Sequence, residues 1–106
     1  MENLFAYGSL KEKEVQELVF GRVLKGIPDK LIGYALKKIK IEEEFGMTTY
    51  PIITATHNPE DTIDGILYQI SLKELQLSDT YEGLHYKRIQ VKLHSNEVVW
   101  VYSITE

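Results

Sequence analysis

The stretch NLFAYGSLKE, residues 3–12, decides how the first part of the chain is expected to fold. Residues 3–7 form a short apolar run that is typical of a buried strand, and the glycine and serine that follow break it. Ser9 stands three residues before Glu12, which is the spacing of a helix capping box, and apolar residues follow at helical spacing. The sequence therefore predicts a strand, a tight loop and a helix that ends at Gly21.

The same turn has the residue types of a ligand cradle. A glycine directly after a strand lets the backbone approach a ligand closely, and a helix start offers unpaired N–H groups to an anion such as a carboxylate. Ser9 adds a hydroxyl group. The glycine and lysine pattern of a phosphate-binding loop is absent from the stretch. On these residues alone, a purely structural turn capped by Ser9 is the simpler interpretation.

The rest of the chain reads as strands with one further helix. The expected strands cover residues 31–41, 50–53, 62–70, 86–93 and 98–102. Ser71 and Glu74 form a second capping-box pair that opens a short helix towards Tyr81, with Gly83 as its end. Five or six strands and two helices that do not alternate regularly predict an α+β domain with a closed or strongly curled sheet, not a doubly wound parallel sheet.

Composition narrows the function classes. The 106 residues are enough for one domain, 1–106, and a formal net charge of −4 makes the chain a poor candidate for binding nucleic acid. The one dense basic stretch, Lys37 to Lys40, is interpreted as the solvated face of a strand. The absence of cysteine excludes disulfides and thiol-based zinc sites. We see neither a signal peptide nor an apolar run that could span a membrane, so we expect a cytoplasmic protein.

A second segment with chemical potential is DTYEGLHYKR, residues 79–88. A carboxylate beside a glycine turn, screened by aromatic walls, can have its pKa raised into a range that suits a general base. Arg88 would serve either as an anchor for anionic groups or as a structural partner for Asp79. By composition alone, an ordinary helix-turn-strand surface is again the simpler interpretation.

The histidines give weaker indications. A triad of Ser9, His85 and Asp79 can be written down, but no nucleophile-elbow sequence supports it. His57 and His94 are expected to be exposed, and no pair of histidines has the spacing of a zinc motif. We therefore predict no metal site.

Taken together, the motifs resemble those of the gamma-glutamyl cyclotransferase-like superfamily. The matching segments are LFAYGSL at 4–10, YPI at 50–52, DGILY at 64–68, LSDTYEGLHYKR at 77–88 and VY at 101–102. They occur in the expected order over essentially the whole chain, and are most similar to the short bacterial-type and avirulence-induced-protein-like branch, which includes gamma-glutamylamine cyclotransferases. The sequence departs from the pattern at Ser78, which splits the usual Leu-Asp pair, and residues 42–47 have no counterpart.

The resemblance implies a compact mixed β-barrel with flanking short helices. It also implies a pocket in which the loop after the first strand faces the Glu-Gly turn. Glu82 would be the catalytic acid and base. The backbone of Tyr7, Gly8, Ser9 and Leu10 would hold the α-carboxylate of the substrate, and Tyr86 and Tyr102 would be pocket walls.

The implied reaction is an intramolecular aminolysis that releases 5-oxoproline and a free amine from a γ-glutamyl compound, with no metal or organic cofactor. Three alternatives stay open: a non-catalytic small-molecule binding member of the same fold, an enzyme that removes or transfers a γ-glutamyl group in a biosynthetic pathway, and an interaction protein without a pocket. The last alternative predicts that Glu82 lies far from residues 7–10. The leaving amine and the choice between monomer and homodimer are not determined by the sequence.

Overall fold

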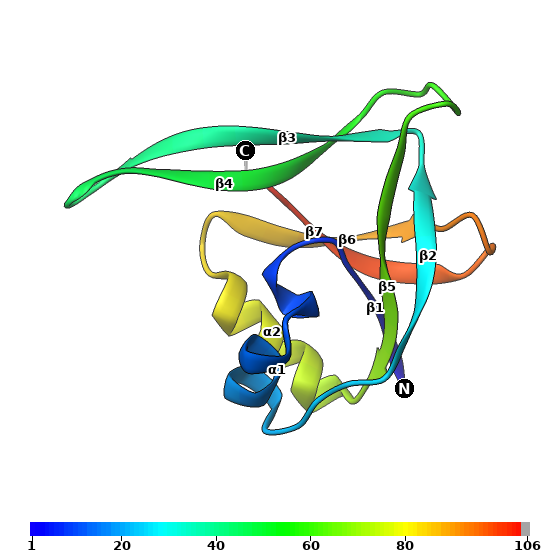
Figure 1. Ribbon diagram of the computed structural model, residues 1–106, viewed down its shortest axis with the longest axis horizontal. Helices are drawn as coiled ribbons and strands as arrows, with labels where there is room; N and C mark the ends of the chain where they lie inside the picture. The colour runs from blue at the N-terminus through cyan, green and yellow to red at the C-terminus, as the bar shows by residue number, and fades with distance from the viewer. Residues whose placement is uncertain (105–106) are drawn as a thin grey trace.

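The computed structural model describes residues 1–104, which form seven strands, two α-helices and one 3₁₀ turn (Figure 1). In chain order the elements are β1 Glu2–Ala6, η1 Ser9–Lys11, α1 Lys13–Phe20, β2 Gly26–Ile32, β3 Tyr34–Glu43, β4 Gly46–Ala55, β5 Thr62–Ile70, α2 Leu72–Glu82, β6 Tyr86–Lys92 and β7 Val98–Ile104. Neither helix is long and apolar enough to cross a membrane.

The strands form one five-stranded sheet and one separate two-stranded ribbon. The sheet has the order β2-β5-β1-β7-β6, in which β1 runs antiparallel to β5 and parallel to β7. β7 therefore has a neighbour on each side, as its nearly continuous apolar sequence predicts. The predicted α+β class is confirmed, but over residues 1–104 the sheets do not close into a barrel because β3 and β4 pair only with each other.

The strand predicted over residues 31–41 is in fact parts of two strands. Gly33 has a φ of +83°, which an L side chain rarely adopts, and it turns the chain from β2 into β3. Its N–H donates to the carbonyl of Asp61 and its carbonyl accepts from Thr56, both at 2.8 Å. The short edge strand predicted at 50–53 likewise belongs to the ten-residue β4. The split of residues 31–41 raises the strand count to seven, above the predicted five or six.

Only one of the two predicted capping boxes forms. At the start of α2 the Glu74 amide donates to the Ser71 hydroxyl at 3.1 Å, and the Ser71 amide donates to the Glu74 carboxylate at 2.9 Å. The box predicted for Ser9 and Glu12 is wrong, because a 3₁₀ turn intervenes and α1 begins only after Glu12, without a side-chain cap. Gly21 follows the end of α1 as predicted.

The core lies on both faces of the sheet, and β1 contributes to each. Leu4 and Ala6 pack in the cluster that includes the helix residue Leu75, whereas Phe5 packs in the cluster on the opposite face. Gly65 on the neighbouring β5 leaves room for this packing, since a Cβ there would lie 2.4 Å from the Phe5 ring and 2.6 Å from the Ala6 carbonyl. β1 is thereby fixed, and its end leads directly into the loop that follows.

Candidate active site

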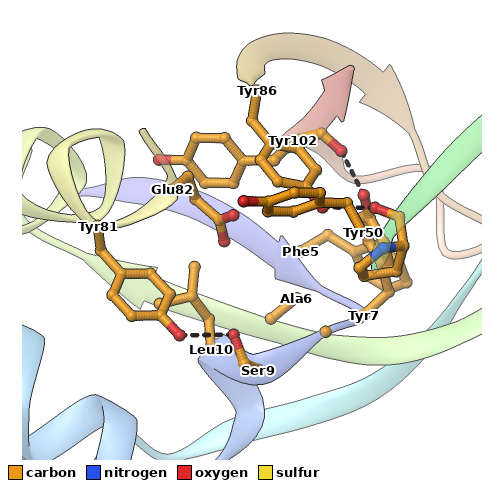
Figure 2. A pocket seen from close by; sticks show the side chains of 12 residues that line it. Phe5, Ala6, Tyr7, Ser9, Leu10, Tyr50, Tyr81, Glu82, Tyr86 and Tyr102 are labelled. Carbon is orange, nitrogen blue, oxygen red and sulfur yellow. Dashed lines mark hydrogen bonds between the residues drawn. The ribbon is translucent and has the colours of Figure 1, made fainter. Parts of the chain in front are cut away.

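A pocket of about 280 Å³ opens where β1 ends, between the C-terminal end of α2 and the β3–β4 ribbon (Figure 2). Its lining consists of Phe5, Ala6, Tyr7, Gly8, Ser9, Leu10, Tyr50, Pro51, Tyr81, Glu82, Tyr86 and Tyr102. All seven site residues that the sequence suggested are among these twelve. The interaction protein without a pocket predicted the opposite arrangement, with Glu82 far from residues 7–10.

Glu82 is the last residue of α2 and is half-buried. Gly83 follows with a φ of +79° and turns the chain away, and Figure 2 shows the Glu82 carboxylate pointing into the cavity. Burial in the pocket raises the pKa of Glu82 from an ordinary value of 4.5 to about 7, because desolvation disfavours the charged form. A carboxyl group with this pKa can both accept and return a proton near neutral pH.

The loop after β1 lines the same pocket and has backbone N–H groups without a backbone acceptor. The amides of Lys11 and Glu12 donate to the carbonyls of Gly8 and Ser9, but within residues 1–104 the amides of Gly8, Ser9 and Leu10 have no such backbone acceptor. Unpaired amides are the usual condition of a helix start and suit an anion. A Cβ added at Gly8 would meet only open space, so the backbone there is accessible to a ligand.

Ser9 does not cap a helix but contacts α2 instead. Its hydroxyl lies 2.7 Å from the hydroxyl of Tyr81, the residue before Glu82 (Figure 2). This contact ties the loop to the end of the helix at one side of the pocket. Both hydroxyls are exposed, so they remain available to a polar group of a bound molecule.

Tyrosines form most of the remaining wall. The Tyr7 hydroxyl donates to the backbone carbonyl of Tyr102, and the Tyr86 hydroxyl donates to the carbonyl of Pro51, each at 2.7 Å. Burial raises the pKa of Tyr86 to about 12 and raises that of Tyr7 further. Both phenols are therefore neutral at physiological pH, and their donated hydrogen bonds fix the rings as walls.

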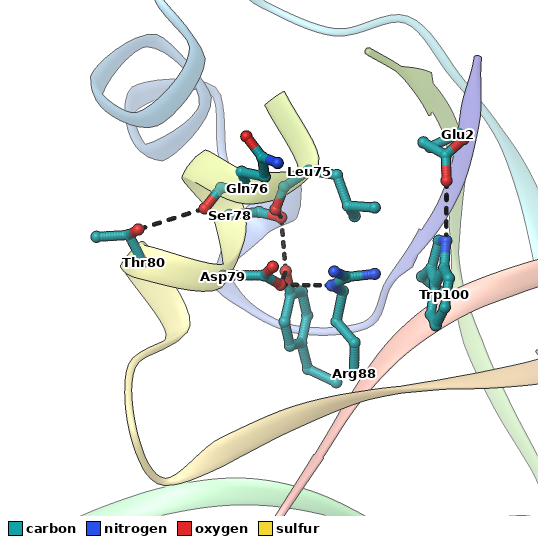
Figure 3. Close-up of polar contacts among 9 residues, drawn as sticks. Glu2, Leu75, Gln76, Ser78, Asp79, Thr80, Arg88 and Trp100 are labelled. Atoms are coloured by element: carbon teal, nitrogen blue, oxygen red, sulfur yellow. Dashed lines mark hydrogen bonds and ion pairs between the residues drawn. The ribbon is translucent and has the colours of Figure 1, made fainter. Parts of the chain in front are cut away.

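Tyr102 contributes its ring to the pocket, while its hydroxyl bonds to a polar network whose members Ser78, Asp79 and Arg88 are shown in Figure 3. The hydroxyl donates to Asp79 Oδ1 at 2.7 Å and lies 2.6 Å from the Ser78 hydroxyl. Arg88 Nε donates to the same Asp79 oxygen at 2.5 Å, and the guanidinium stacks 4.5 Å above the Trp100 ring. Of the two roles considered for Arg88, the geometry supports that of a structural partner for Asp79.

The triad written from Ser9, His85 and Asp79 is not assembled. Ser9 is engaged by Tyr81, and Asp79 is engaged by Arg88 and Tyr102. His85 Nε2 instead lies 3.9 Å from a carboxylate oxygen of the ribbon residue Glu43. Residues 1–104 contain no group of three or more His, Asp or Glu side chains arranged to hold a metal ion.

Sequence reasoning missed five pocket residues, namely Phe5, Ala6, Tyr50, Pro51 and Tyr81. Tyr50 and Pro51 belong to one of the segments that resemble the family, but the resemblance implies no role for them. Tyr81 directly precedes Glu82 in the sequence, and this position was the signal that could have identified it. The unmatched stretch 42–47 also bears on the pocket, because the Tyr50 hydroxyl donates to the Glu43 carboxylate. The ring of Tyr50 lies edge-on to that of Tyr86, with centroids 6.0 Å apart. The ribbon thus supplies one wall.

Similarity to known proteins extends over nearly the whole chain. A family model described as "Gamma-glutamyl cyclotransferase, AIG2-like" matches residues 4–106. No curated protein matches the sequence. The solved structure of At3g28950.1 from Arabidopsis thaliana is 28% identical with a TM-score of 0.72, and the match covers 98% of this chain and 61% of that one. The chain therefore spans less than two thirds of that relative's length.

Two more distant structures show the same fold. The uncharacterized protein loc79017 from Homo sapiens is 20% identical with a TM-score of 0.79, and the match covers 99% of this chain and 67% of that one. A structure described as "Gamma-glutamyl cyclotransferase" is 19% identical with a TM-score of 0.75, again over 99% and 67% of the two chains.

Proposed function

The chain belongs to the gamma-glutamyl cyclotransferase, AIG2-like family, and we propose on that basis that it releases 5-oxoproline and a free amine from a γ-glutamyl compound. The observation that carries the proposal is the Glu82 carboxyl group, which has a pKa of about 7 and faces a loop with unpaired backbone amides across one pocket. Within the proposal, Glu82 is the acid and base and the loop is the substrate cradle.

The chemical problem is to make the α-amine of the substrate nucleophilic. At neutral pH this amine is mostly an ammonium group, so it has no free electron pair. The Glu82 carboxylate accepts one ammonium proton, and the amine nitrogen then attacks the γ-carbonyl carbon and forms the ring C–N bond. The ring nitrogen loses a second proton as the bond to the leaving nitrogen breaks. The leaving nitrogen takes up both protons and departs as an ammonium ion, and Glu82 relays them in turn.

Positioning supplies much of the expected rate. In this proposal the amides of Gly8, Ser9 and Leu10 bind the α-carboxylate of the substrate, which is supported by their lack of backbone acceptors among the described residues. With that group anchored, the γ-glutamyl chain must fold back towards Glu82 within a cavity of about 280 Å³. Holding the amine near its own carbonyl converts a rare conformation of the free substrate into the bound one.

The lining favours a leaving amine that carries no carboxylate. Among the described residues, the twelve that line the pocket include no lysine, arginine or histidine, while Glu82 supplies negative charge. A second carboxylate on the leaving group would therefore lose water without gaining a cationic partner. Neutral or cationic amines would lie against tyrosine rings, which attract cations through their π faces.

The test is an assay of 5-oxoproline release from a panel of γ-glutamyl amines, γ-glutamyl amino acids and glutathione-type peptides. We expect release to be fastest from the amines and to fall roughly 10²–10⁴-fold in Glu82→Gln. Glu14→Gln, at an exposed carboxylate on α1, is the matched control and should keep full activity. A folded protein that binds members of the panel without turnover would contradict the proposal and favour a non-catalytic binding role.

A further inference from the structure

Among the described residues the β3–β4 ribbon pairs with no other strand, so the outer edge of β3 is unpaired along its whole length. Figure 1 shows β4 on the side of the ribbon nearer the rest of the molecule and β3 on the outer side. Among the described residues β3 pairs only with β4, through all ten residues from Tyr34 to Glu43. An exposed edge of this length presents a row of backbone donors and acceptors to any strand that fits beside it.

The charges along this edge have a definite order. Residues 37–44 read KKIKIEEE, so the cationic side chains come first and the anionic ones follow. All of these charged side chains are exposed. Lysines on an edge strand normally repel a second strand. Here the glutamates that follow would neutralise them, provided that the second strand has the same sequence and runs in the opposite direction.

We propose that two copies of this chain associate through their β3 edges, antiparallel, about a two-fold axis that passes between the two Ile41 residues. An axis perpendicular to the ribbon keeps the same ribbon face on the same side in both copies, so even-numbered residues lie opposite even-numbered ones. Lys40 then lies opposite Glu42, a pair that occurs twice by symmetry, and Lys38 lies near Glu44, which follows the end of β3 in the turn. Opposite charges placed directly across a strand pair stabilise it.

The neighbouring register is less favourable. An axis through Lys40 would also pair Lys38 with Glu42 and Lys37 with Glu43, but it would place the two Lys40 side chains directly opposite each other, and like charges in that position are destabilising. The Ile41 register also leaves Glu43 free to keep its hydrogen bond from Tyr50. In addition it brings Phe45, which is 96% exposed at the tip of the ribbon, alongside Lys37 of the other copy. The aliphatic stem of that lysine can cover part of the ring.

A contact limited to one strand edge is small, so the dimer is expected to be weak and to dissociate on dilution. Its ion pairs are exposed, so added salt should screen them and weaken the association. The inference is independent of the proposed activity. It does connect the two sites, since the ribbon that pairs also carries Tyr50 and Pro51 of the pocket wall.

Cysteine cross-linking tests the register, and the absence of native cysteine makes the readout clean. Ile41→Cys should form a disulfide-linked dimer under mild oxidation, because residues directly opposite in an antiparallel pair lie about 4.5–5.5 Å apart between Cα atoms, within disulfide reach. Ile39→Cys is the matched control on the same face, and should form no disulfide-linked dimer because residue 39 lies opposite Glu43 of the other copy. Equal cross-linking of the two variants would overturn the proposed register.

Charge reversal tests the complementarity by sedimentation velocity at low salt. The acidic variant Lys38→Glu/Lys40→Glu and the basic variant Glu42→Lys/Glu44→Lys should each show a dissociation constant raised at least tenfold. Mixed together they should form a heterodimer, and the four changes in one chain should restore the homodimer. A wild-type protein that is monomeric at all concentrations, or an acidic variant that dimerises as well as the wild type, would refute the proposal.

Discussion

The hydroxyl groups of Ser9 and Tyr81 lie 2.7 Å apart and join the loop after β1 to the last turn of α2. The two segments are far apart in the sequence, yet this contact sets the loop beside Glu82. Because the hydroxyls are exposed, their hydrogen bond should contribute little to the free energy of unfolding, within about 1 kcal/mol. Its expected effect is on how the pocket is held.

Ser9→Ala and Tyr81→Phe should therefore impair catalysis in the same way, because each removes the contact between the loop and α2. We expect each to lower kcat/KM for 5-oxoproline release by roughly 3–10-fold, and the double variant to be no slower than the slower single variant, since either change removes the same contact. A double-mutant cycle on kcat/KM measures the coupling. Multiplicative losses in the double variant would show that the two side chains act separately.

Tyr102→Phe should destabilise the fold. The change removes the hydroxyl that donates to Asp79 and contacts Ser78, a side chain that is 0% exposed. Ser78 keeps its bond to the Leu75 carbonyl and Asp79 keeps Arg88, so the loss of the hydroxyl should cost the net value of a hydrogen bond, about 0.5–1.5 kcal/mol in the free energy of unfolding. Urea unfolding measures it, with Tyr34→Phe as the control. An unchanged unfolding midpoint in Tyr102→Phe would mean that water replaces the lost hydroxyl.

Glu82→Gln should stabilise the protein at alkaline pH. The pKa of Glu82 is about 7 in the folded state against an ordinary 4.5, so the folded protein holds this proton more tightly than the unfolded chain. Stability from this group is present below pH 4.5 and is lost as the pH rises through 7. At pH 8 the variant should exceed the wild type by about 1–3 kcal/mol relative to their difference at pH 4. Urea unfolding at the two pH values tests the sign, and a pH-independent difference would contradict the raised pKa.

Substitution by alanine should affect substrate binding at Gly8 and fold stability at Gly65. Gly8→Ala adds a Cβ into open space, so the fold should be unaffected while KM rises if a substrate lies against that backbone. Gly65→Ala forces a Cβ against the Phe5 ring and the Ala6 carbonyl, so it should lower the melting temperature clearly. Thermal unfolding and steady-state kinetics of both variants check this. A normal KM in Gly8→Ala would reduce the loop to a structural role.

Local patterns predicted most of the regular elements correctly. The Ser71 capping box, the end of α1 at Gly21 and the strand over residues 62–70 all depend on neighbouring residues, so the sequence states them directly. The box at Ser9 was wrong because its hydroxyl has a better partner in Tyr81, which is remote in the sequence. Such long-range competition leaves no trace in residue spacing.

The candidate site was predictable only through its motifs. The residue types around Glu82 are also compatible with an ordinary exposed surface. Only the order of several short motifs along the chain identified residues 7–10 and Glu82 as parts of one site. The role of Tyr50 escaped prediction because it depends on how the ribbon folds over the pocket, after Gly33 turns the chain. The Asp79–Arg88 pair was one of two alternatives, and the geometry distinguished them.

The most direct test of the central claim, that Glu82 is the acid and base of the reaction, is the pH dependence of kcat/KM for 5-oxoproline release. For the wild type we expect kcat/KM to rise about tenfold per pH unit at acidic pH and to level off above about 7, where the Glu82 carboxyl group ionises. At pH 8 the kcat/KM of Glu82→Gln should be roughly 10²–10⁴-fold lower than that of the wild type, and it should not show the tenfold rise per pH unit at acidic pH. A variant with near-normal turnover and the same profile would contradict the assignment.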